Sequence, residues 1–214
     1  MAAWTYIQNF NSLNTADLTG QDSWSGDVLF DVQESVVQEG AKAVLGSPPS
    51  STEIYIARTL PAGVDSGTMI FYVRATKTSG EAGSLQFRVG TTYAGRIRLN
   101  ADIYIDGLTD GTIIKSAFGA NTWYKITVEF LSSTTFRAKV DEGAFSAAIT
   151  YGGGQSNPDT LRFTAYDTGS IYWDNINDGT IASSIKTING LIKASIKTVN
   201  NLAIASVKNW NGLV

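Results

Sequence analysis

Residues 84–107 read SLQFRVGTTYAGRIRLNADIYIDG, and this stretch sets the fold class. Three runs in it, 84–90, 95–100 and 102–107, alternate apolar with polar residues and end in glycine, asparagine or aspartate-glycine. Period-two alternation bounded by such residues is typical of half-buried antiparallel strands. The stretch therefore predicts three consecutive strands, each with one face in a core and one face toward solvent.

The same alternation continues on both sides of this stretch. It recurs in seven further runs, at 53–58, 68–75, 112–117, 123–130, 136–140, 160–166 and 170–176. Ten closely spaced strands in about 180 residues predict an all-β fold, a two-sheet antiparallel jelly-roll sandwich. Residues 33–44, QESVVQEGAKAV, come nearest to a helical pattern, but Gly40 argues against a helix there.

The last 34 residues have a different character. They read SIKTINGLIKA (184–194), SIKTVNNLAIA (195–205) and SVKNWNGLV (206–214), an 11-residue repeat whose third copy is cut short. An Asn-Gly step between apolar runs predicts a short β-hairpin, and a repeat of this length needs neighbours to bury a core. We expect a jelly roll over 1–180 and a β-repeat tail over 181–214 for anchoring or oligomerisation, with a frayed terminus as the alternative. The residues expected to make assembly contacts are Ile185, Ile188, Leu191, Ile196, Val199, Leu202, Val207 and Trp210.

The composition excludes several classes of function. Lysine and arginine number 16 against 19 acidic residues, so nucleic acid is not an expected partner, and no stretch approaches the ~18 apolar residues of a membrane span. The absence of cysteine and histidine excludes thiol nucleophiles, Ser-His-Asp triads and His- or Cys-based metal sites. Asp102 and Asp106 share one strand face, but about 13 Å separates them, more than paired catalytic carboxylates need. We therefore expect no enzyme.

Arginine and tyrosine lie on the predicted outward faces of the central strands. If these strands share a sheet, six residues form one surface: Tyr72, Arg74, Arg88, Arg96, Arg98 and Tyr104. Aromatic rings stack on the C–H faces of pyranoses while arginine binds hydroxyls, so the set predicts carbohydrate binding. Two other interpretations stay open. One is an ordinary solvated face in which arginine stems cover apolar surface, and the other is a subunit interface, where both residue types are enriched.

Three segments resemble a known family. FNSLNTADLTGQDSW (10–24), VVQEGAKAV (36–44) and IYWDNI (171–176) are similar, in this order, to concanavalin A-like lectin/glucanase domains of the laminin-G-like kind. The resemblance covers about residues 4–178 and implies a two-sheet jelly roll that binds carbohydrate. The Glu-x-Asp-x-Glu triplet of the glucanase branch is missing, so that activity is not implied.

The same resemblance implies a structural calcium ion near the closing strand. It makes Asp174 the first candidate ligand and Asp22 the second, with a strand-end hydrogen bond as the alternative role for Asp174. Calcium binds through six to eight oxygen atoms, so these two carboxylates alone do not define a site. No other cofactor is expected.

The C-terminal repeat resembles the tails of tailed-phage structural proteins and of some bacterial surface proteins. The N-terminal residues show neither the basic region nor the apolar core of a signal peptide, whereas lectin-like folds usually work outside the cell. A virion protein, made in the host cytosol and released by lysis, satisfies both observations.

We therefore expect a non-enzymatic phage virion structural protein of the decoration or adhesion type, located in the virion. Its expected partners are other virion subunits or copies of itself, held through the tail, and glycans. The alternative is a free or cell-surface carbohydrate-binding module.

Overall fold

The structure is a computed structural model that describes residues 2–107 and 111–180, together with the backbone of four two-residue strands farther along the chain. The chain divides into two compact units, Met1–Gly179 and Thr180–Val214. This division lies one residue from the boundary that the repeat pattern predicts.

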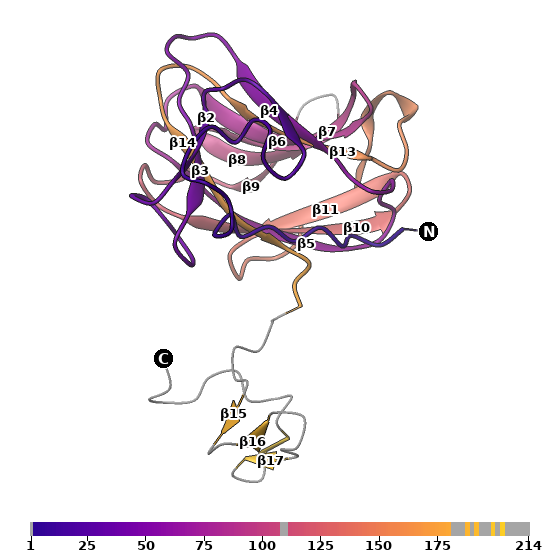
Figure 1. The fold of residues 1–214 in the computed structure, drawn as a ribbon. Coiled ribbons are helices and arrows are strands. Elements are labelled where there is room, and N and C mark those ends of the chain that lie inside the picture. The colour runs from indigo at the N-terminus through magenta and orange to yellow at the C-terminus, as the bar shows by residue number, and fades with distance from the viewer. Residues whose placement is uncertain are drawn as a thin grey trace. The chain divides into compact units, whose positions relative to one another are not determined.

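The first unit consists of two antiparallel sheets packed as the layers of a sandwich (Figure 1). Sheet A has the order β1 (Trp24–Gly26), β4 (Ile54–Thr59), β13 (Thr160–Ala165), β6 (Glu81–Val89), β7 (Thr92–Asn100), β8 (Asp102–Asp106) and β9 (Thr112–Lys115). Sheet B has the order β12 (Ile149–Thr150), β11 (Thr135–Val140), β10 (Tyr124–Ser132), β5 (Gly67–Ala75), β14 (Ile171–Asn177), β3 (Ala43–Gly46) and β2 (Phe30–Gln33). A single 3-10 turn, η1 (Gly152–Gly154), is the only helical element of the described residues.

The predicted fold class is confirmed: the chain is all-β, and its two sheets form an antiparallel jelly-roll sandwich. Each of the ten predicted strands is present. Segment 33–44 forms no helix; its first residue ends β2 and its last two residues begin β3. Strands β1, β2, β3 and β12 have four residues or fewer, too few for alternation to stand out in the sequence.

Aromatic side chains join the two sheets across the core. Phe163 of sheet A stacks on Trp173 of sheet B with ring centroids 4.7 Å apart, and on its other side it stacks on Trp24 at 4.8 Å. Phe87 of sheet A meets Phe130 of sheet B edge to face at 5.4 Å. Large buried rings contribute most of the apolar area of such a core, so they fix which face of each strand points inward. The alternate residues of sheet A must then point away from sheet B.

The tail contains two short paired ladders. Strand β15 (Thr187–Ile188) pairs with β16 (Leu191–Ile192), and β17 (Thr198–Val199) pairs with β18 (Leu202–Ala203). The pairs occupy the same positions in the first and second copies of the repeat. Of the predicted assembly residues, Ile188, Leu191, Val199 and Leu202 lie in these strands. The other four lie outside the described residues: Ile185, Ile196, Val207 and Trp210.

No helix among the described residues is long and apolar enough to cross a lipid bilayer.

Candidate functional site

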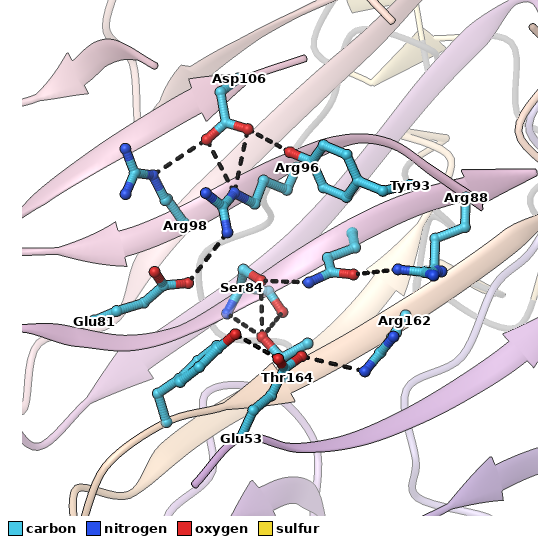
Figure 2. Close-up of polar contacts among 12 residues, drawn as sticks. Glu53, Glu81, Ser84, Arg88, Tyr93, Arg96, Arg98, Asp106, Arg162 and Thr164 are labelled. Atoms are coloured by element: carbon cyan, nitrogen blue, oxygen red, sulfur yellow. Dashed lines mark hydrogen bonds and ion pairs between the residues drawn. The ribbon is translucent and has the colours of Figure 1, made fainter. Parts of the chain in front are cut away.

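The outer face of sheet A, which points away from sheet B, carries two rows of mostly polar side chains. Cross-strand partners in an antiparallel sheet share a face, so the strand register defines each row. One row runs through Ala57, Arg162, Gln86, Arg96 and Asp106. The next row runs through Tyr55, Thr164, Ser84, Arg98 and Tyr104. We call this surface the polar face; Figure 2 shows its central part.

Asp106 gathers the positive charges at one end of the polar face. Its carboxylate accepts a hydrogen bond from Arg96 Nε at 3.0 Å, forms an ion pair with Arg98 Nε at 3.1 Å, and accepts a hydrogen bond from the Tyr93 hydroxyl. Arg96 also reaches Glu81, with its Nη1 3.5 Å from Oε1 (Figure 2). Burial and the bond to Asp106 raise the pKa of Tyr93, so this phenol stays protonated and donates. Two guanidinium groups and one phenol are thereby held in place by one buried carboxylate.

Hydroxyl and amide groups form the floor of the polar face. The Ser84 and Thr164 hydroxyls lie 2.7 Å apart, and both side chains are fully buried. Gln86 is 5% exposed, and its amide nitrogen reaches Ser84 Oγ at 3.4 Å. Its amide oxygen accepts a hydrogen bond from Arg88 Nη1 at 2.9 Å. Buried polar groups on the outward side of a sheet are unusual for a freely solvated face, so longer side chains must cover them.

Glu53 organises the opposite end of the polar face. Its Oε1 pairs with Arg162 Nη2 at 3.2 Å, and its Oε2 accepts a hydrogen bond from the Tyr166 hydroxyl. Burial and this bond raise the pKa of Tyr166. The guanidinium of Arg162 lies 3.6 Å from the centroid of the Tyr55 ring, a cation–π contact. Tyr55 therefore fixes Arg162 from one side while Glu53 fixes it from another.

A cavity of about 260 Å³ opens between the two ends. Its lining residues are Glu53, Gln86, Arg88, Tyr93, Arg96 and Arg162. Small-ligand sites commonly enclose ~300–1,000 Å³, so this cavity suits one sugar-sized group rather than a large buried ligand. Three guanidinium groups and one amide offer hydrogen-bond donors here, and a single carboxylate offers acceptors. This donor-rich lining suits a ligand that presents many oxygen acceptors.

The hairpin between β6 and β7 places Arg88 at the cavity. Val89 pairs with Thr92, which leaves two residues between the strands, and Gly90 has φ of +54°, as tight hairpins of this length require. Arg88 pairs across the hairpin with Tyr93, and its guanidinium donates to the carbonyl of Thr91. The turn thus fixes the side chain of Arg88, which precedes it.

Four of the six residues predicted for a shared surface lie on the polar face or at its cavity: Arg88, Arg96, Arg98 and Tyr104. The prediction that Tyr72 and Arg74 share this sheet is wrong. Both lie on β5, which pairs with β10 and β14 in the middle of sheet B. Arg74 donates there to Asn121 Oδ1 at 3.1 Å. Alternation shows which face of a strand points outward, but it does not show which sheet the strand joins.

Five residues that shape the site are absent from the set predicted from the sequence: Glu53, Gln86, Tyr93, Asp106 and Arg162. Arg162 had a usable signal, since it alternates with the buried Leu161 and Phe163 in its strand. That signal gains meaning only once β13 is known to lie beside β6.

Asp22, the second predicted calcium ligand, is committed to other partners. Its Oδ2 accepts hydrogen bonds from the Tyr6 hydroxyl at 2.8 Å and from the Gln8 amide at 2.7 Å. Its Oδ1 lies 2.8 Å from Arg58 Nη1. Both oxygen atoms are occupied, so Asp22 does not fit the role of a calcium ligand.

Asp174, the first predicted ligand, is fully buried on β14. Its Oδ2 accepts backbone hydrogen bonds from Gln38 at 2.9 Å and Glu39 at 3.0 Å, whereas its Oδ1 has no hydrogen-bond partner. Burial raises the pKa of Asp174, and the neighbouring backbone N–H groups oppose that rise only in part. Across residues 2–107 and 111–180, no three acidic side chains form a group that could hold a metal ion. The unbonded Oδ1 of Asp174 could serve as one calcium ligand. The other oxygen ligands of the ion would have to come from the main chain or from water, so calcium binding stays a prediction.

Comparison with known proteins places the fold. No protein-family model matches the sequence, and no curated protein matches it. Among solved structures, the cellulose-induced protein Cip1 is similar over 76% of this chain and 94% of its own, at 13% identity and a TM-score of 0.55. The transglycosylase Crh5 is similar over 82% of this chain and 83% of its own, at 15% identity and a TM-score of 0.55.

A third similar structure is the binding domain of Paraclostridial Mosquitocidal Protein 1. It covers 81% of this chain and 48% of its own, at 12% identity and a TM-score of 0.53. Identities this low establish a shared fold and nothing finer. The chain therefore has the concanavalin A-like jelly-roll fold that the three sequence segments indicate.

Proposed function

We propose that this protein is a carbohydrate-binding module and that the cavity on its polar face holds a sugar residue of a glycan. The observation that carries the proposal is the lining of the cavity, where Arg88, Arg96 and Arg162 surround the buried amide of Gln86. Sugars present many hydroxyl oxygens at fixed positions, and rigidly held donors recognise them. The fold supports the proposal, because similar structures include a cellulose-induced protein and a transglycosylase.

A binding role, rather than catalysis, suits the carboxylates of the polar face. Glu53 and Asp106 each accept from a tyrosine hydroxyl and pair with at least one arginine. A carboxylate with its lone pairs engaged in this way is available neither to attack a sugar nor to protonate a leaving group. We therefore assign both groups to positioning the arginines.

The test is a glycan screen with the full chain, followed by two arginine variants. We expect binding that Arg162→Met abolishes and Arg137→Met preserves. Arg137 is a suitable control because it also pairs with a glutamate, Glu129, but lies on sheet B. Thermal unfolding of both variants checks that they are folded. A folded wild-type chain that binds no glycan in the screen would refute the proposal.

A second proposal concerns the tail: it assembles copies of this chain or attaches it to other subunits, as in a virion structural protein. The observation that favours it is the strand pair at equivalent positions of two repeat copies. Short strands gain main-chain partners and apolar contacts by adding to neighbouring chains. Light scattering on the full chain and on residues 1–180 tests it. We expect only the full chain to form oligomers. If particles of the full chain and of residues 1–180 contain the same number of protomers, the assembly role is contradicted.

A further inference from the structure

Arg88 is the arginine of the cavity that has no carboxylate partner. Arg96 pairs with Glu81 and Asp106, and Arg162 pairs with Glu53. Arg88 instead donates to two neutral acceptors, the Gln86 amide oxygen and the Thr91 carbonyl. Within residues 2–107 and 111–180, no carboxylate oxygen lies within 4.0 Å of its guanidinium nitrogens. One positive charge of the cavity is therefore oriented but not neutralised.

The surroundings make this charge costly while the cavity is empty of an anion. Burial and the neighbouring Arg162 lower the pKa of Arg88, so both act against its positive charge, and the charge of Glu53 opposes them only in part. An anionic group entering the cavity would relieve this repulsion. A guanidinium presents its N–H groups in a planar fork that matches the two oxygens of a carboxylate.

The contacts that hold Arg88 also prepare it for binding. Gln86 is itself anchored on the buried Ser84, and the carbonyl of Thr91 belongs to the tight hairpin that follows β6. Because these partners are neutral, they fix the side chain without satisfying its charge. The ordering cost that usually opposes binding is then smaller.

We propose that the sugar residue held in this cavity is acidic and that Arg88 binds its carboxylate, as a hexuronic acid residue would present it. The inference rests on the proposed function and names its ligand class. The cavity admits a group of this size, and Arg162, on the neighbouring strand, adds a second positive charge to it. Glu53, the one carboxylate of the lining, is engaged by Arg162 and Tyr166 and leaves Arg88 without a partner.

Calorimetry with the full chain tests the proposal through a change in the ligand alone. The probes are trimers of galacturonic, glucuronic and mannuronic acid, each compared with its carboxyl-reduced form, in which a neutral hydroxymethyl group replaces the carboxylate. Hydrogen bonds to charged groups contribute ~1.5–3 kcal/mol, so the reduced form of the bound trimer should bind about 10- to 100-fold more weakly. A trimer of otherwise neutral sugars that carries one sulfate ester is included to separate carboxylate from sulfate recognition.

Two variants locate the effect. Arg88→Gln should remove the preference for the acidic trimer, whereas Arg74→Gln should preserve it. Arg74 is a matched control because it too is a strand arginine bonded to a neutral side chain, Asn121, but it lies on sheet B. Near-ultraviolet circular dichroism confirms that both variants are folded.

The outcomes distinguish this inference from the proposed function. Equal affinity for the acidic and reduced forms, or binding of neutral or sulfated trimers only, overturns the acidic assignment and leaves glycan binding in place. Loss of preference in Arg74→Gln rather than Arg88→Gln overturns the location. Failure to bind any glycan in the broader screen overturns the proposed function itself.

Discussion

Replacing Asp106 with asparagine removes the central negative charge of the polar face and preserves the shape of the side chain. The carboxylate is 3% exposed and serves Arg96, Arg98 and Tyr93. Hydrogen bonds to charged groups contribute ~1.5–3 kcal/mol and neutral ones ~0.5–1.5 kcal/mol, so the bonds from Arg96 and Tyr93 each lose about 1 kcal/mol, and the ion pair with Arg98 is lost as well. Water offsets part of this loss, because the Arg96 and Arg98 side chains are 24% and 20% exposed. We expect Asp106→Asn to lower the free energy of unfolding by about 2–3 kcal/mol.

Equilibrium denaturation in urea, followed by tryptophan fluorescence, measures this difference. Glu142→Gln is the matched control: it also exchanges a carboxylate for an amide, but its side chain is 85% exposed and pairs with Lys125 at 3.4 Å. Exposed ion pairs contribute little to stability, so the control should resemble the wild type. If Asp106→Asn and Glu142→Gln unfold at the same urea concentration, the reasoning that one buried carboxylate holds the arginines is refuted.

Three further predictions follow from single side chains. Burial raises the pKa of Tyr151. The stability that its protonated form contributes is therefore present below the unfolded-state pKa of about 10 and is lost as pH rises toward the folded-state pKa. Tyr151→Phe should flatten the fall in unfolding free energy above pH 10, which denaturation at several pH values measures. In EDTA, Asp174→Asn should raise the melting temperature, because it removes a buried charge with one unbonded oxygen. Adding about 1 mM calcium should then stabilise the wild type and not the variant. Equal responses to calcium would exclude Asp174 as a ligand. Tyr104→Ala should weaken glycan binding only a few-fold in calorimetry, since its ring stacks under Arg98 at 4.5 Å but does not line the cavity; complete loss of binding would place the sugar farther along the sheet.

The sequence predicts the strands well because alternation is a local property. In 84–107 most apolar positions, such as Leu85, Ile97 and Ile105, are buried in the structure. The side chains between them consequently point outward, as the pattern predicts. Strands β1, β2, β3 and β12 escape this argument, since two to four residues carry too little pattern to exceed chance.

The site is less predictable because strand order is not local. β13 lies beside β6 although residues 90–159 separate them in the chain, and this neighbourhood brings Arg162 to Gln86. Because the strand order is not visible in the sequence, the prediction also placed Tyr72, of sheet B, with residues of sheet A. The ion pairs are equally hard to predict from the sequence, because the carboxylate partner of each arginine lies on or next to a different strand.

These ion pairs are what give the polar face its chemistry. Glu53 and Asp106 lie at opposite ends of the polar face, and each holds an arginine next to a tyrosine. The carboxylates therefore hold the other arginines in place, and none of them forms an ion pair with Arg88. A face whose acids were free would repel an acidic sugar, and a face without acids would let its arginines move. Pairing all but one of the lining arginines satisfies both requirements, and it leaves Arg88 as the lining arginine without an ion-pair partner, which a carboxylate ligand can supply.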